Sequence, residues 1–212
     1  MYSPGYHICR LESFNKDPTQ QDWIAVKRIF RYLKGTIHYK LTYCNSNPLV
    51  GYSDASYAPG IDRKSISGFI FLFNGGPVSW RSRKQNITAT SSMESEFIAL
   101  GDAVKEALWF RKLQTEFQLK TELIIYEDNQ STIKFSQNAT HSDRTKHIDI
   151  RFYFIIEHLK LKHYALEYCP TTMMLADALT KPLGRILLSK HSLGMGLVSD
   201  YGGMLDNQSL IK

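Results

Sequence analysis

The order of strands and helices is the feature of this sequence that most restricts its fold. Three runs rich in β-branched and aromatic residues come first, joined by short turns, which predicts an antiparallel meander. Helical patterns then alternate with two further strands. The strands are predicted at 49–56, 66–73, from 78 onward, at 122–126 and at 163–168, and the helices at 92–119, after 129, at 146–161 and at 172–180. Antiparallel strands followed by helical crossovers predict an α/β fold, a mixed sheet with helices on its faces.

A shorter unit precedes this pattern. The run Asp17-Pro18-Thr19 predicts the start of a helix over 19–34, Gly35 its end, and a strand follows over 36–43. Apolar residues recur at helical spacing at Trp23, Val26, Phe30 and Leu33. The turn-forming run 45–48 marks a boundary. We therefore expect an N-terminal segment over 1–45, one domain over 46–198 and a loose tail over 199–212.

Basic residues are concentrated in the N-terminal segment. The chain has a net charge of +6, and residues 1–45 hold seven Lys and Arg against three acids, which is +4 of that total. Lys27, Arg31 and Lys34 fall on a different helix face from the apolar residues. A basic segment beside a nearly neutral domain favours an anionic partner. A solvated basic surface is the alternative.

Several classes of protein are excluded by what the sequence lacks. Its three cysteines form no CxxC pair, so we expect neither a disulfide scaffold nor a zinc ribbon, and a reducing compartment fits. The longest apolar run, about 68–73, is far too short to cross a membrane. The first ten residues contain no apolar stretch of a signal peptide, so we do not expect secretion.

Two aspartates lie where strands are predicted to end. Asp54 shares a strand face with Val50 and Tyr52, an unusual place for an aspartate, although a bulge would also explain it. Asp128 directly follows a buried-type strand, where sites in α/β sheets collect. Its alternative role is to cap the following helix.

Two glutamates in the first turns of the long helix have different predicted roles. Ser91 and Glu94 fit a capping box, which gives Glu94 a structural task. Glu96 falls on the buried arc defined by Phe97, Leu100 and its helical neighbours. A buried carboxylate has to be paired, protonated or bound to a metal, so Glu96 is the functional candidate.

A fourth acid, Asp177, is the only one in the mostly apolar run 172–179, and pairing with Lys181 is its alternative role. Converging carboxylates repel one another unless a cation holds them. The four acids together predict a hard, oxygen-preferring cation, Mg²⁺ or Mn²⁺. The histidines form no HxxxH pair, which argues against zinc.

Six sequence blocks, in order between about 50 and 196, resemble the ribonuclease H region of copia-type LTR retrotransposon Pol polyproteins. The blocks are 52–56 (YSDAS), 79–85 (SWRSRKQ), 91–96 (SSMESE), 128–131 (DNQS), 144–151 (RTKHIDIR) and 175–182 (LADALTKP). Residues 17–43 resemble the segment that links the reverse transcriptase to that region. The resemblance implies a ribonuclease H-like fold with a five-stranded mixed sheet.

The resemblance also implies a two-ion Mg²⁺ or Mn²⁺ site formed by Asp54, Glu96, Asp128 and Asp177. It places Gln130 in the minor groove of an RNA–DNA hybrid, and Ser91 and Ser92 on a backbone phosphate. From their charge and position, Arg81, Arg83 and Lys84 are further candidates for phosphate contacts, as are Lys27, Arg31 and Lys34. One departure is Glu167, which stands where many ribonucleases H carry a histidine.

The implied activity is endonucleolytic hydrolysis of the RNA strand of RNA–DNA hybrids. The implied partners are the hybrid, the reverse transcriptase and the rest of the Pol polyprotein, with no membrane. The implied location is a cytoplasmic retrotransposon particle or the nucleus. Two alternatives remain open: another nuclease or a DDE transposase on the same fold, and a non-catalytic remnant or domesticated hybrid-binding module.

Overall fold

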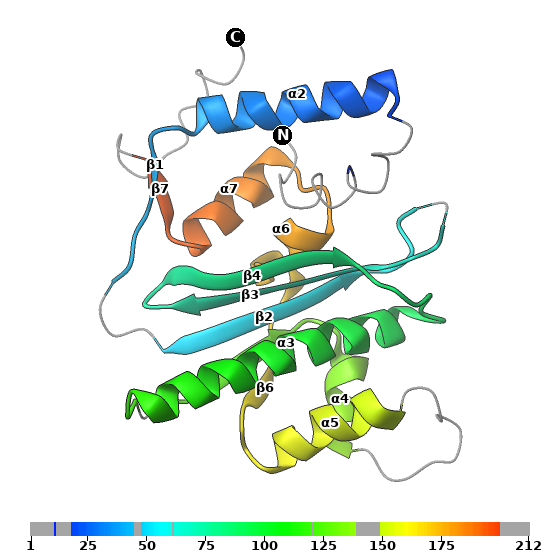
Figure 1. Ribbon diagram of the computed structural model, residues 1–212, viewed down its shortest axis with the longest axis vertical. Coiled ribbons are helices and arrows are strands. Elements are labelled where there is room, and N and C mark those ends of the chain that lie inside the picture. Colours follow the sequence, from blue (N-terminus) through cyan, green and yellow to red (C-terminus); the bar gives the residue numbers. More distant parts are fainter. Residues whose placement is uncertain are drawn as a thin grey trace.

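A five-stranded mixed sheet forms the centre of the molecule in the computed structural model, which describes residues 11, 18–44, 48–60, 62–119, 121–138 and 149–199 (Figure 1). Its strands are β2 (Leu49–Ser56), β3 (Ile66–Phe73), β4 (Gly76–Lys84), β5 (Leu123–Glu127) and β6 (Ala165–Tyr168). Their spatial order is β4-β3-β2-β5-β6. The first three pair antiparallel, whereas β5 runs parallel to β2 and β6 parallel to β5. The predicted α/β class and mixed sheet are confirmed.

Helices cover both faces of this sheet. One face carries α3 (Ser92–Glu116), α4 (Gln130–Asn138) and α5 (Asp149–Lys160), and the other carries α6 (Asp177–Thr180) and α7 (Arg185–Gly194) (Figure 1). The larger apolar core lies under α3, where Phe97, Leu100 and Val104 pack against Phe71 and Ile125. Because β3 is buried at every position but its last, it needs the continuous apolar run that the sequence supplies.

The predicted helix over 172–180 is wrong in its extent. The chain forms a 3₁₀ turn at Thr171–Met173 and only four helical residues at Asp177–Thr180. Met174, Leu175 and Ala176 between them are all buried, and Leu175 packs in a different apolar cluster from the other two. These neighbouring side chains enter two different apolar clusters, and the chain leaves the helical path between them.

Two elements were not predicted, α7 and β7 (Leu197–Ser199). Ser199 is therefore the last residue of a strand and not the first of a loose tail. Strand β7 pairs antiparallel with β1 (Tyr39–Leu41), which is shorter than the strand expected over 36–43. The expected tail from 200 onward, the first residues of the helix predicted from 146 and the sequence before Leu11 lie outside the described residues. The domain limits at 45 and 198 stay predictions.

The N-terminal helix α2 (Gln20–Gly35) forms as expected, but its apolar face is not covered. Thr19 and Asp22 make a reciprocal capping box at its start. Trp23, Phe30 and Leu33 are each more than half exposed, so the described chain does not bury this apolar stripe. Instead Tyr32 packs against the apolar cluster between α6 and α7. Among the described residues, none of the helices is long and apolar enough to cross a lipid bilayer.

Candidate metal centre

Asp54 is fully buried near the carboxyl end of β2, at the middle of the sheet. The pairing of β2 with β3 is continuous from Val50 to Ser56, so the alternative of a bulge at Asp54 is excluded. Both carboxylate oxygens accept hydrogen bonds from the end of α6: Oδ1 from Lys181 Nζ at 2.9 Å and Oδ2 from the Thr180 hydroxyl. The aspartate is therefore held on the α6 side of the sheet, the side that Val50 and Tyr52 share.

A glycine on the neighbouring strand allows α6 to come this close. Gly68 is the partner of Asp54 in the β2–β3 ladder. A Cβ atom at Gly68 would lie 2.7 Å from Thr180 Cγ2 and 2.9 Å from Leu179 Cβ. Such distances are shorter than carbon atoms tolerate, so any side chain at Gly68 would push α6 off the sheet.

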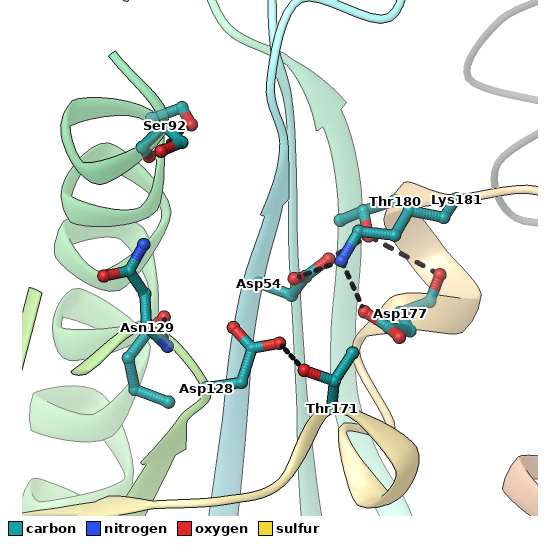
Figure 2. A network of polar contacts seen from close by, with 10 residues as sticks. Asp54, Ser92, Asp128, Asn129, Thr171, Asp177, Thr180 and Lys181 are labelled. Carbon is teal, nitrogen blue, oxygen red and sulfur yellow. Dashed lines mark hydrogen bonds and ion pairs between the residues drawn. The ribbon is translucent and has the colours of Figure 1, made fainter. Parts of the chain in front are cut away.

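Asp128 follows β5 and lies beside Asp54, because the carboxyl ends of the parallel strands β2 and β5 meet at one edge. The cap of α4 is supplied by Asn129, whose Oδ1 accepts from the backbone N–H groups of Ser131 and Thr132. Asp128 Oδ2 instead accepts from the Thr171 hydroxyl at 2.8 Å (Figure 2). The alternative of a helix cap at Asp128 is therefore wrong, and its carboxylate faces the site.

The two glutamates of α3 differ in burial as the sequence predicts, but Ser91 and Glu94 form only half of the predicted capping box. Ser91 caps the helix by accepting from the Glu94 backbone N–H at 3.1 Å, and the Glu94 carboxylate turns back to the backbone N–H and hydroxyl of Thr90. Glu94 thus bonds the residue before the cap rather than the cap itself. Glu96 is buried, and its Oε2 has no hydrogen-bond partner.

Three of the four predicted acids form one cluster. Oxygen atoms of Asp54, Glu96 and Asp128 all lie within 4.8 Å of one another. Asp177 joins them through Lys181, whose Nζ donates to Asp177 Oδ1 at 2.7 Å as well as to Asp54 (Figure 2). Both interpretations of Asp177 therefore hold in geometry: it pairs with Lys181, and it lies at the carboxylate cluster.

Burial makes these carboxylates difficult to ionise. It raises the pKa of Glu96 well above its ordinary value, and the charges of Glu127 and Asp54 raise it further. Burial also raises the pKa of Asp54 and of Asp177, although Lys181 opposes the rise at both. A bound divalent cation would compensate these charges, since it is a strong local positive charge.

A fifth acid beside the cluster, Glu127, was missed by sequence reasoning. It is fully buried, its Oε1 accepts from the Asn129 backbone N–H at 3.3 Å, and its Oε2 has no partner. Burial raises its pKa well above the usual value, and the charge of Asp54 adds to the rise. A signal was present, because Glu127 shares the buried face of β5 with Leu123 and Ile125 by the period of two.

The predicted nucleic-acid contacts surround this cluster unevenly. Ser91 is engaged in its cap, while Ser92 and Gln130 are exposed at the starts of α3 and α4. Arg81 and Arg83 are exposed on the edge strand β4, and Lys84 is paired with Asp62 at 2.6 Å. Lys27, Arg31 and Lys34 lie on α2, outside the carboxylate cluster, with Lys27 Nζ 5.8 Å from the centre of the Trp23 ring. Glu167 is exposed on β6.

Curated relatives of the chain include Pol polyproteins of transposons. The chain is 39% identical over 187 residues to the retrovirus-related Pol polyprotein from transposon TNT 1-94 of Nicotiana tabacum, which covers 86% of this chain and 14% of that protein. It is 47% identical over 102 residues to the secreted RxLR effector protein 161 of Plasmopara viticola, covering 47% of this chain and 72% of the effector. No protein-family model matches the chain.

A solved structure shares the fold at low sequence identity. A foamy viral protease–reverse transcriptase in complex with RNA/DNA hybrid matches with a TM-score of 0.53 and 16% identity, over 81% of this chain and 22% of that one. The LC11 RNase H1 isolated from compost matches with a TM-score of 0.49 and 18% identity, over 64% of this chain and 94% of that one.

The strand order β4-β3-β2-β5-β6, with acids from β2, β5, α3 and α6 at one edge, defines a ribonuclease H-like domain. The chain is homologous to a segment of the retrovirus-related Pol polyproteins of plant transposons. It spans about one-seventh, 14%, of the length of the plant-transposon relatives that it matches.

Proposed function

We propose that this domain hydrolyses the RNA strand of RNA–DNA hybrids with the help of two divalent ions, Mg²⁺ or Mn²⁺. The observation that carries the proposal is the carboxylate cluster of the buried Asp54 and Glu96 and the partly buried Asp128, within 4.8 Å of one another. It lies where the carboxyl ends of the parallel strands β2 and β5 meet. Such a cluster is costly for a fold to maintain without a cation. The family and the ribonuclease H-like topology make phosphodiester hydrolysis the activity that fits it best.

The chain's own groups fit hard cations. All the donors are carboxylate oxygens, the ligands that Mg²⁺ and Mn²⁺ prefer. Glu96 Oε2 and Glu127 Oε2 are buried without a partner, and a ligand to the cluster would satisfy such atoms. Asp54, Glu96, Asp128 and Asp177 would hold the ions.

When bound, the ions would supply a hydroxide-like water and stabilise the leaving 3′ oxygen of an in-line displacement. The protein's part is to fix its carboxylates: Thr180 orients Asp54, Thr171 orients Asp128, and the cap of α3 sets the direction of Glu96. The expected products carry a 5′-phosphate and a 3′-hydroxyl.

The substrate would be recognised at the edges of this site. Gln130 and Ser92 are exposed at two helix starts beside the acids, where backbone N–H groups and side-chain oxygens suit phosphates and ribose. A ribonuclease would distinguish RNA through its 2′-hydroxyl groups, which the wide minor groove displays. Arg81 and Arg83 on β4, and the basic residues of α2, would add phosphate contacts.

In this proposal the domain acts beside a reverse transcriptase as part of a Pol polyprotein, in a cytoplasmic particle or the nucleus. The solved foamy viral protein with a matching fold was captured on an RNA/DNA hybrid, which supports a hybrid as the substrate here.

The test is cleavage of a hybrid that carries a label on its RNA strand. We expect cleavage with Mg²⁺ or Mn²⁺ and none with EDTA or with Ca²⁺, which accepts looser coordination and should not assemble the reactive geometry. Duplex DNA of the same sequence is the matched control. Equal cleavage of duplex DNA would instead favour the transposase or general nuclease alternative, and tight hybrid binding without cleavage would favour the hybrid-binding module.

A further inference from the structure

Lys181 occupies the place between two site aspartates where a cation is needed. It follows the last residue of α6, and its Nζ lies 2.9 Å from Asp54 Oδ1 and 2.7 Å from Asp177 Oδ1. Figure 2 shows the ammonium between the two carboxylates, with a dashed line to each. The side chains of both aspartates are buried, whereas that of Lys181 is 33% exposed.

The position of Nζ excludes a metal that uses the same two carboxylate oxygens. A Mg²⁺ ion that joined the same two oxygens would lie about 2.1 Å from each. Its centre would then fall within contact distance of an ammonium that is less than 3 Å from both oxygens, and the two positive charges would repel each other. One of the two cations has to leave, and the exposed part of the Lys181 side chain gives the ammonium a way toward solvent.

The surrounding acidic side chains favour a positive charge at this position. Asp54, Glu96 and Asp128 cluster at the site. Asp177 and Glu127, both buried, add their negative charges to it. Burial by itself would lower the pKa of Lys181, but the carboxylates of Asp54 and Asp177 outweigh it and raise the pKa above the ordinary value. A permanent positive charge on the α6 side thus offsets part of the repulsion among the acids.

We propose that Lys181 is an internal counterion that holds Asp54 and Asp177 in place when no metal is bound, and that a divalent ion must displace its ammonium from Asp54 to bind there. Lys181 therefore sets the metal affinity of the site. It acts through the carboxylates and is a positioning residue. The inference rests on the proposed metal-dependent function.

The first test measures metal binding without any turnover. Lys181→Met removes the charge and nearly keeps the length of the side chain. Lys105→Met is the matched control, because the exposed Lys105 pairs with Asp102 on α3, away from the site. By titration calorimetry with Mg²⁺ and Mn²⁺, we expect Lys181→Met to bind at least 10-fold more tightly than wild type and Lys105→Met to bind like wild type. In EDTA, we expect the melting temperature of Lys181→Met to fall by several degrees and to be recovered when Mn²⁺ is added.

A second measurement on the wild-type chain covers the case in which Lys181→Met does not fold. With ¹⁵N-labelled lysine, the Lys181 Nζ resonance, assigned by its loss in Lys181→Arg, should move with the same Kd that calorimetry gives. An unchanged metal affinity in Lys181→Met, or an Nζ resonance that does not shift when metal binds, would overturn this inference and leave the proposed function intact. If no variant binds either metal, both proposals fail.

Discussion

The two longest helices of the described chain, α2 and α3, teach opposite lessons about apolar patterns. Helix α3 buries ten of its 25 residues, among them the charged Glu96. Helix α2 buries none of its 16, and leaves Trp23 and Phe30 in solvent. In α3 packing against the sheet decides where a carboxylate points. In α2 the same kind of periodicity identifies an apolar face but says nothing of what covers it. The position of a charged residue in a helical pattern therefore predicts a functional role only where packing against a core fixes the direction of its side chain.

The sharpest test of this contrast compares the two glutamates of α3. Glu96→Gln removes an anionic ligand from the cluster, so hybrid cleavage should fall about 100-fold or more, the scale of losing one electrostatic stabiliser. Its stability in EDTA should not fall, because one buried, repelling charge is gone.

Glu94→Gln is the matched control for that variant, on the same helix and with the same chemical change. It should retain most activity and lose only a few tenths of a kcal/mol of stability, since a glutamine can still serve near the cap. An inactive Glu94→Gln beside an active Glu96→Gln would shift the site by two residues and refute the helix-face argument.

The next largest effect concerns the approach of α6 to the sheet. Gly68→Ala places a methyl group against Thr180 and Leu179, which should cost about 1–3 kcal/mol of unfolding free energy and weaken both hybrid cleavage and Mn²⁺ binding. Gly184→Ala is the control, because nothing lies within 4 Å of a Cβ at that position. Denaturant melts and Mn²⁺ titrations of the two variants make the comparison. A fully active Gly68→Ala would mean that the site does not depend on this contact.

A pH effect follows from the buried glutamates. Burial raises the pKa of Glu96 and Glu127 in the folded state above the 4.5 of an ordinary glutamate. The folded chain then holds more protons than the unfolded chain above pH 4.5, so these groups stabilise it at lower pH and lose that effect as pH rises through the folded-state pKa. In EDTA, the free energy of unfolding should therefore decline from about pH 5 toward neutrality, by at most about 1.4 kcal/mol per pH unit for each group. The melting temperature should fall with it.

Glu127→Gln, which stays neutral, should flatten this pH dependence, whereas Glu116→Gln at the exposed end of α3 should leave it unchanged. Melting curves from pH 5 to 8 in EDTA, for wild type and both variants, provide the measurement. Identical pH slopes in wild type and Glu127→Gln would show that Glu127 does not titrate in this range.

The smallest expected effect lies on α2. Reversing the charges of Lys27, Arg31 and Lys34 should reduce the salt dependence of hybrid binding, because fewer counterions are released, with a change in slope of up to about 0.9 for each phosphate that is no longer neutralised. The cleavage rate at saturating substrate should stay the same. Charge reversal at the exposed Lys112 on α3 is the control. An unchanged slope in the α2 variant would mean that this basic face is solvated or packs elsewhere.

Sequence reasoning succeeded where local signals and burial agree. Strands β2 and β3 begin and end at the predicted residues, because apolar β-type runs are bounded there by turn residues. The predicted burial of Asp54 and Glu96 is confirmed.

The predictions from sequence failed where tertiary contacts decide the local structure. The helix predicted over 172–180 is interrupted, because its residues pack into two different apolar clusters. Glu127 directly follows the predicted strand over 122–126, and its proximity to the acids depends on the neighbouring β2.

The pairing of β1 with β7 has a practical consequence for how the chain can be divided. Tyr39–Leu41 lies against Leu197–Ser199, the Thr42 backbone N–H donates to Gly196 at 2.9 Å, and that of Cys44 donates to Asn74 at 2.7 Å. A recombinant fragment that starts at 46 would lose all three attachments and leave β7 as an unpaired edge, which is a hazard for aggregation. A fragment that starts before α2 keeps the pairing of β1 with β7 and both hydrogen bonds.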